Sequence, residues 1–363
     1  MEKMLFTSES VTSGHPDKVC DLIADTILDE AIRQDPDAHM AVEASIKDDL
    51  ILVFGEAGTS AVLDYEAIAK RVMKEIGYEE EYHVILKVNR QSAEINSAVD
   101  GEELGAGDQG IMFGYASNET ENLMPFAIDC ANRLAKKLEE VRRRTPFLRP
   151  DGKTQVTAEY RDGVPARVDT VVISTQHTAD ITQEELRKFI IEEVIRPVIK
   201  PEYIDDDTKF LINPSGSFIV GGSWGDSGTT GRKTAVDTYG GYAPHGGGCF
   251  SSKDPTKVDR SASYYARYAC RSIVANGLAD RCLLEVAYAI GVAKPLSIAV
   301  EAFGTSRYSN QELTEIVKRN FDFSVSNIIK ELDLKRPIYA QTTNYGHFGR
   351  EGLPWEAYKE IKL

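Results

Sequence analysis

The sequence has 363 residues, of which 42% are hydrophobic and 27% are charged. At about 100–200 residues per domain, this predicts two or three domains of ordinary globular composition and excludes a disordered chain, a collagen and a coiled-coil rod. Lys and Arg number 42 and Asp and Glu 57, so the formal net charge of −15 argues against wholesale binding of nucleic acid or of an anionic membrane.

A short glycine-containing motif near the start of the chain precedes the first predicted helix. Gly14-His15-Pro16-Asp17-Lys18 is followed by apolar residues at helical spacing, from Val19 to Ile32. Asp17 and Lys18 are therefore expected in or beside the first helical turn, where the backbone N–H groups and the helix dipole favour an anion.

Three times along the chain, two apolar runs joined by a polar turn precede a helical pattern. The runs are expected to form strands of β-hairpins, at residues 41–45 and 50–54, 155–160 and 167–174, and 283–290 and 296–302. The helix after the first pair has Ile68, Val72 and Ile76 four apart, and the later two begin with capping boxes at Thr182 and Ser309. We therefore predict an α+β fold of three similar subdomains, each a layer of β-hairpin and helix. Their expected bounds are residues 3–100, 107–220 and 221–356.

Two segments interrupt this plan. Residues 96–110 lack periodicity and are rich in glycine and acidic residues, which is typical of a long mobile loop acting as a lid or a linker. Residues 215–259 carry many glycines, which indicates backbone brought close to a ligand.

Cations and carboxylates alternate among these glycines. The basic residues are Lys153, Arg232, Lys233, Lys253 and Lys257, and the acidic residues are Asp226, Asp254 and Asp259. Lys and Arg bind phosphate oxygens, and Asp binds Mg²⁺, so the pattern favours a site for polyphosphate and Mg²⁺.

Three other motifs suggest different chemistry. Residues 105–110 match G-x-G-x-x-G, but polar and acidic residues precede them where a dinucleotide fold needs an apolar strand. Gly152-Lys153-Thr154 resembles the end of a P-loop, but Phe147 stands where its first glycine should be. Ser223 lies in a G-x-S-x-G pentapeptide, with His245 opening an HGGG string and His347 late in the chain. A serine hydrolase using Ser223 is thus an alternative, although the HGGG string follows the serine and no parallel scaffold is predicted.

Other sequence features concern the compartment. The five cysteines form no C-x-x-C pair, the first ten residues lack a signal-peptide pattern, and no apolar run is long enough to span a bilayer. We therefore expect a cytoplasmic protein without disulfides.

Long strings across nearly the whole chain resemble the S-adenosylmethionine synthase (methionine adenosyltransferase) family. They include SESVTSGHPDKVCDLIADTILDEAI, GAGDQGIMFGYASNET, STQH, GDSGTTGRK, DTYGGYAPHGGGCFSSKDPTKVDRSA, ADRCLLEVAYAIGVAKPLSI and YGHFGRE. The resemblance implies three subdomains with pseudo-threefold symmetry, a homotetramer built as a dimer of dimers, and active sites at the dimer interface. It implies that methionine sulfur attacks C5′ of ATP and displaces tripolyphosphate, which is then hydrolysed to pyrophosphate and phosphate. The implied cofactors are K⁺ and Mg²⁺, with two Mg²⁺ per active site. A non-catalytic sensor of ATP or S-adenosylmethionine is a second alternative.

The resemblance also assigns site residues. It places His15, Lys153, Arg232 and Lys253 in the catalytic set. It implies that ATP contacts these four together with Ser217, Phe218, Asp226, Lys233 and Cys249. Methionine is expected at Glu56, Gln91, Asp108, Asp226 and Lys257. Asp17 and Asp259 are the expected Mg²⁺ ligands and Glu43 the expected K⁺ ligand, while residues 96–109 resemble the family's gating loop.

This sequence departs from the family pattern at a few positions around the expected nucleotide. Ser217 replaces a basic residue, Ser223-Trp224 replaces a segment that usually has proline, and Cys249 and Ser252 stand where Ala and Gly are common. These positions affect the expected fit to adenine and ribose, whereas the phosphate and metal positions are intact.

Overall fold

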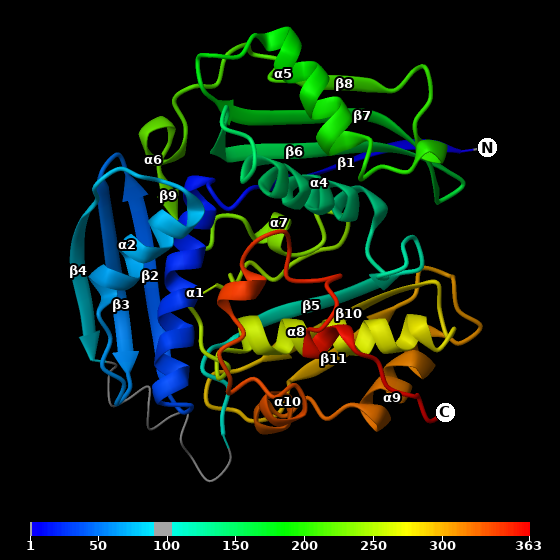
Figure 1. Ribbon diagram of the computed structural model, residues 1–363. Helices are drawn as coiled ribbons and strands as arrows, with labels where there is room; N and C mark the ends of the chain where they lie inside the picture. Colours follow the sequence, from blue (N-terminus) through cyan, green and yellow to red (C-terminus); the bar gives the residue numbers. More distant parts are fainter. Residues whose placement is uncertain (1, 91–103) are drawn as a thin grey trace.

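The computed structural model describes residues 2–90 and 104–363. Figure 1 shows three sheets, each with helices against it. The strand orders are β4-β3-β2-β9, β1-β6-β7-β8 and β11-β10-β5. The predicted α+β fold of three hairpin-and-helix units is confirmed.

The first unit packs two helices on one face of the first sheet. Its elements are β2 (His39–Lys47), β3 (Leu50–Gly58), β4 (His83–Arg90), β9 (Gly228–Thr229), α1 (Pro16–Gln34) and α2 (Tyr65–Ile76). Alternate residues of β2, including Met40, Val42 and Ala44, are buried in the core with Ile23 and Val72 of the two helices. The predicted first hairpin is confirmed.

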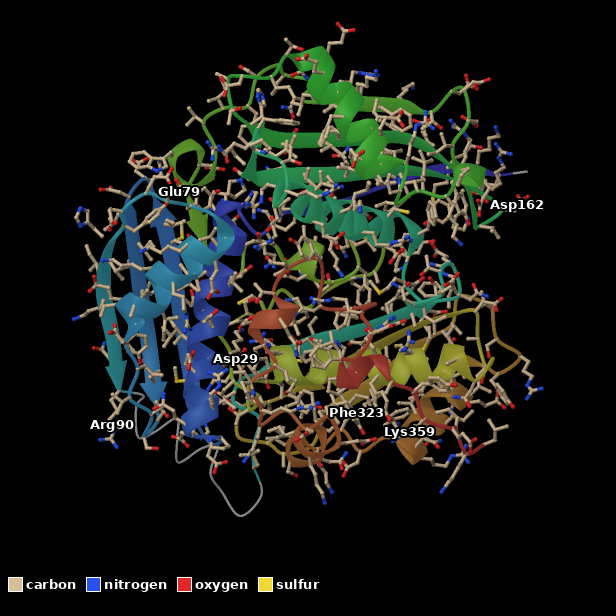
Figure 2. All side chains as sticks on the ribbon, in the orientation of Figure 1. Asp29, Glu79, Arg90, Asp162, Phe323 and Lys359 are labelled. Atoms are coloured by element: carbon tan, nitrogen blue, oxygen red, sulfur yellow. The ribbon has the colours of Figure 1, made fainter. Side chains whose placement is uncertain are left out.

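The second unit contains the longest hairpin. Its elements are β1 (Lys3–Val11), β6 (Leu148–Arg161), β7 (Val164–His177), β8 (Lys209–Ile212), α4 (Phe126–Arg142) and α5 (Gln183–Ile190). Asp162, which is labelled in Figure 2, and Gly163 form the turn of this hairpin, with φ values of 50° and 81°. A two-residue turn whose twist matches that of the strands requires a positive φ at both positions. The capping box predicted at Thr182 is present.

The third unit has the smallest sheet and the helix that is buried most. Its elements are β5 (Gly110–Ser117), β10 (Arg281–Tyr288), β11 (Ser297–Glu301), α8 (Val258–Ala275), α9 (Asn310–Asn320) and α10 (Val325–Glu331). The predicted capping box at Ser309 begins α9. The short helices α6 (Gly222–Gly225) and α7 (Thr234–Asp237) lie in the glycine-rich segment, and α7 is drawn between the second and third units in Figure 1. Short helical turns occur at Ile191–Ile195, Pro201–Tyr203, Ala340–Thr342 and Pro354–Glu356.

Each sheet includes a strand from a distant part of the chain. β1 pairs with β6, β5 pairs with β10, and β9 pairs with β2. The first and third units share one hydrophobic core, and the second unit has its own. These exchanges bring the two motifs singled out in the sequence, residues 14–18 and residues 215–259, side by side. Within the described residues, no helix is long and apolar enough to cross a membrane.

Candidate active site

The first predicted site residue, His15, is the N-cap residue directly before α1. Its backbone is extended (φ −62°, ψ 132°), and its Nδ1 accepts a hydrogen bond from the Asp17 backbone N–H at 3.2 Å. Pro16 occupies the first helical turn, where its missing N–H costs no hydrogen bond. The Tyr78 hydroxyl donates to the Gly14 carbonyl at 2.7 Å and so fixes the chain just before His15.

Asp17 is a buried carboxylate at the centre of an ion-pair network. Its Oδ1 accepts the Thr229 backbone N–H at 2.9 Å and lies 3.5 Å from the Arg232 Nε, and its Oδ2 pairs with the Lys233 ammonium. Burial alone would raise the pKa of Asp17, but the bonds from Lys233 and Thr229 outweigh it and hold that pKa below its usual value. The carboxylate is therefore ionised at neutral pH.

Two further predicted residues, Lys153 and Asp226, lie near enough to His15 for their charges to act on it. Burial, followed by the positive charges of Lys233 and Lys153, lowers the pKa of His15 to about 3, while Asp17 and Asp226 act in the opposite direction. Lys153 lies on the exposed side of β6, opposite Val11 of β1. The structure thus brings together six predicted residues around the start of α1: His15, Asp17, Lys153, Asp226, Arg232 and Lys233. We call these the first group.

A second group of predicted residues lies where the glycine-rich segment meets β2 and α8. Lys253 pairs with Asp259, and its backbone forms an isolated bridge to Ala41 of β2. Asp259 lies in the first turn of α8, directly against the HGGG string: a Cβ at Gly248 would be 2.2 Å from its carboxyl carbon. This close approach is a physical reason for glycine at that position.

Lys257 has a partner of its own. Its Nζ donates to the Asp254 Oδ2 at 2.7 Å, and Asp254 also accepts the Met40 backbone N–H at 2.7 Å. Lys257 is largely buried, so contact with a substrate at this position requires the ligand to share the ammonium with Asp254.

The two groups adjoin at Gly231 and Cys249. A Cβ at Gly231 would lie 2.8 Å from the Cys249 Sγ, and Gly231 directly precedes Arg232. Burial raises the pKa of the Cys249 thiol, while Lys253 acts to lower it and Glu43 to raise it. The negative charge of Asp108 acts on Lys253 in turn. Cys249, Glu43 and Asp108 therefore belong with Lys253, Lys257 and Asp259 in the second group.

Glu43 and Glu56 lie on the face of the first sheet that the helices do not cover. Glu43 is paired with Phe54, and Glu56 with Ala41, so all four side chains share a face. Leu50 and Ile85 on the same face are 41% and 52% exposed. Gln91 and residues 96–103 of the predicted gating loop lie outside the described residues.

The predicted nucleotide residue Phe218, which follows Ser217, is held by His177, a residue to which the sequence assigned no role. The backbone N–H of His177 donates to the Phe218 carbonyl at 2.9 Å, and the backbone N–H of Phe218 donates to the His177 Nε2 at 3.0 Å. Asp151, also missed, accepts the Gly222 N–H at 2.9 Å beside Lys153. The STQH string, which ends at His177, was the only signal in the sequence for this support.

The residues of the site suit a metal that is shared with phosphate. Within the described residues there is no group of three or more His, Cys, Asp or Glu side chains able to hold a metal ion. Asp17 and Asp259 each offer one carboxylate, and each lies against a cation of a phosphate-binding type. Mg²⁺ is commonly held by one or two carboxylates together with substrate phosphates and water, so this donor set fits it.

The hydrolase alternative has no nucleophile and base in place. The Ser223 hydroxyl donates to the Asp48 carbonyl at 2.7 Å, and His347 is fully buried with its Nδ1 bonded to the Tyr264 hydroxyl at 2.7 Å. Gly152-Lys153-Thr154 lies within strand β6 rather than in a P-loop. A cavity of about 1040 Å³ between the second and third units is lined by none of the predicted site residues.

Three family models match consecutive parts of the chain. Residues 3–101 match the model described as S-adenosylmethionine synthetase, N-terminal domain. Residues 103–218 match the central domain and residues 220–357 the C-terminal domain of the same family. Together the three matches span nearly the whole sequence.

Proposed function

The chain belongs to the S-adenosylmethionine synthetase family, and from that premise we propose that it is a methionine adenosyltransferase that makes S-adenosylmethionine from ATP, L-methionine and water. The observation that carries this proposal is that cations of the glycine-rich segment pair with carboxylates at the starts of two helices: Arg232 and Lys233 with Asp17 of α1, and Lys253 with Asp259 of α8. These are the groups that a polyphosphate leaving group needs.

In the proposed first step, the methionine sulfur attacks C5′ of ATP, and the bond from C5′ to the triphosphate oxygen breaks. A thioether has a free electron pair and no proton to lose, so the step requires no general base. Alignment of the two substrates supplies up to about 7–11 kcal/mol of the acceleration. The remainder comes from stabilising the negative charge that develops on tripolyphosphate.

The residues divide between the two ends of ATP. His15, Lys153, Arg232, Lys233 and Lys253 hold the leaving oxygen and the phosphates. Ser217, Phe218 and Cys249 bound the nucleoside, and the His177 contacts fix the Phe218 backbone on that side. In the second step these cations keep tripolyphosphate bound while water attacks phosphorus and releases pyrophosphate and phosphate.

Methionine is proposed to bind at Glu56, Gln91, Asp108, Asp226 and Lys257. Asp226 is exposed beside His15, whereas Asp108 and Lys257 belong to the second group. The carboxylates would attract the α-ammonium group, and Lys257 would attract the α-carboxylate.

Asp17 and Asp259 are the residues that would hold Mg²⁺, and Glu43 would hold K⁺. The bound cations would neutralise phosphate charge during both steps. Because Asp17 also contacts Arg232 and Lys233, the same carboxylate orients protein cations toward the phosphates.

We further propose that the site is completed by a second copy of the chain, as part of a homotetramer. Glu43 and Glu56 lie on an outer sheet face that also exposes Leu50 and Ile85, and burying these apolar side chains against another copy would be favourable. The resemblance to the family implies active sites at the dimer interface, so we propose that a two-fold contact through this face places the second group of one copy opposite the first group of the other.

Two assays test these proposals. Purified protein with ATP, Mg²⁺ and K⁺ should form S-adenosylmethionine, detected by mass spectrometry, only when L-methionine is present. ATP binding without turnover would favour the sensor instead.

The shared site is tested with two variants, Lys233→Met and Lys253→Met, each of which is expected to be inactive alone. In an equal mixture after subunit exchange, half of the dimers are mixed, and one of the two sites in each mixed dimer keeps both lysines. The mixture should therefore recover about a quarter of parent activity. No recovery in confirmed mixed dimers would show that both lysines serve a site from one copy.

A further inference from the structure

Helix α1 carries a row of four buried aspartates that extends well beyond the site. Asp17, Asp21, Asp25 and Asp29 follow one another at intervals of four residues, so they lie along one face of the helix. Their exposed fractions are 1%, 0%, 0% and 7%. Only Asp17 has a proposed role in the reaction.

Each carboxylate of the row accepts backbone N–H groups from another part of the chain. Asp17 accepts from Thr229 at 2.9 Å, and Asp21 accepts from Gly231 at 2.8 Å. Asp25 accepts from Ser252 at 2.9 Å. Asp29, labelled in Figure 2, accepts from Tyr339 and Ala340, both at 2.9 Å. The first three acceptors hold segments of the glycine-rich region, and the fourth holds a segment that contains no predicted site residue.

The spacing of the first two acceptors matches that of the bound segment, residues 229–231, which continues from β9. Four residues of α-helix rise about 6 Å, and two residues of extended chain advance about 6.6 Å. Alternate N–H groups of residues 229–231 therefore meet successive turns of α1. The N–H between them, from Thr230, points the other way and donates to the Ala44 carbonyl of β2 at 3.0 Å. Residues 229–231 are thus fixed between α1 and β2, immediately before Arg232 and Lys233.

Asp21 and Asp25 each have a cationic partner that is not one of the predicted site residues. Asp21 lies 3.1 Å from the ammonium of Lys18, which also pairs with Asp237. Asp25 receives two hydrogen bonds from Arg260, at 2.7 and 2.8 Å. Arg232 and Lys253 therefore do not neutralise Asp21 or Asp25 and pair instead with Asp17 and Asp259.

We propose that Asp21 is a positioning residue: its hydrogen bond to the Gly231 N–H sets where Arg232 and Lys233 stand relative to the phosphates. Asp25 does the same for Ser252, the neighbour of Lys253. This inference rests on the proposed function, because it takes those cations to be the polyphosphate ligands.

The direction in which anion affinity changes in Asp21→Ala distinguishes a positioning role from a role through charge alone. Removing the negative charge of Asp21 raises the positive potential near the anion site, so a role through charge alone predicts tighter binding of anions in Asp21→Ala. A positioning role predicts weaker binding, because the segment that carries Arg232 and Lys233 loses one of its anchors. Asp29→Ala is the matched control, since it removes a buried acceptor from the same face of the same helix.

The test is calorimetric titration of each full-length variant with inorganic pyrophosphate in the presence of Mg²⁺. We expect the dissociation constant to rise roughly tenfold in Asp21→Ala, the scale of one hydrogen bond to a charged group, and to stay within about twofold in Asp29→Ala. In steady-state kinetics the KM for ATP should rise in Asp21→Ala, while the KM for methionine changes little.

A second variant covers a failure of Asp21→Ala to fold. In Asp21→Asn the amide oxygen is expected to turn toward the Lys18 ammonium, which leaves the Gly231 N–H without an acceptor, so pyrophosphate binding should weaken here too. Tighter or unchanged binding in the folded variants would overturn the inference. A parent protein that makes no S-adenosylmethionine would instead refute the proposed function.

Discussion

Gly228 should be intolerant of even one additional methyl group. A Cβ at this position would lie 2.1 Å from the Pro16 carbonyl oxygen and 2.8 Å from the Asp17 N, whereas Cβ contacts under 3.0 Å are essentially never found. All the nearest atoms are backbone atoms in the first turn of α1, so no side chain can rotate away. In Gly228→Ala the strand must therefore move from the helix by about 1 Å.

That displacement would lengthen two hydrogen bonds from backbone N–H groups to carboxylates: the bond from Thr229 to Asp17, now 2.9 Å, and the bond from Gly231 to Asp21, now 2.8 Å. Bonds to charged groups contribute about 1.5–3 kcal/mol each, so losing both would lower the free energy of unfolding by about 3–6 kcal/mol. Urea denaturation followed by circular dichroism measures this, with S-adenosylmethionine formation assayed in parallel. The control is Gly225→Ala, where the nearest atom, the Val220 carbonyl oxygen, is 3.1 Å away. If the stability of Gly228→Ala lies within about 1 kcal/mol of the control and its activity is normal, the close approach of β9 to α1 is not what orders the site.

Three further substitutions probe single residues. Cys249→Ala should keep activity within about twofold, because burial raises the pKa of this thiol and no charge is lost; a large loss would show dependence on the thiol. Asp17→Asn should raise the Mg²⁺ concentration needed for half-maximal activity, and a titration that overlays the parent's would exclude Asp17 as a ligand. Burial raises the pKa of Asp29 to about 6, with Asp25 and Arg260 acting on it in opposite directions. The folded protein therefore binds this proton more tightly than the unfolded chain, and Asp29 contributes stability that is lost as pH rises from about 4 to 6. Relative to the parent, Asp29→Asn should gain up to about 3 kcal/mol across that range in urea denaturation, and a difference independent of pH would contradict this.

Local features of the fold could be predicted because neighbouring residues determine them. The polar turn expected between residues 160 and 167 and the capping boxes expected at Thr182 and Ser309 depend on contacts within a few residues. The turn was found at Asp162-Gly163, and both capping boxes are present. The helix after Pro16 was likewise predicted from spacing alone.

The long-range pairings could not be predicted in this way. The sequence of residues 3–11 does not indicate that they pair with β6. The sequence of residues 228–229 likewise does not indicate that they form β9 and pair with β2 in the first sheet. The row from Asp17 to Asp29 looks like the polar face of an amphipathic helix. It is buried because distant loops supply the N–H groups that the carboxylates accept.

The sequence proposed which residues make up the candidate site, but not how they are arranged. The alternation of cations and carboxylates indicated polyphosphate, and the structure places Arg232 and Lys233 on Asp17, and Lys253 on Asp259. Asp21, Asp151 and His177 contact the backbone of distant segments, and apart from the STQH string no motif in the sequence pointed to these contacts.

The most direct test of the account is a reaction in ¹⁸O-labelled water with ATP, L-methionine, Mg²⁺ and K⁺. Attack of sulfur on C5′ followed by hydrolysis of tripolyphosphate predicts S-adenosylmethionine, pyrophosphate and phosphate in equal amounts, with the label only in the phosphorus products. Labelled phosphate without S-adenosylmethionine would contradict the account and leave a triphosphatase.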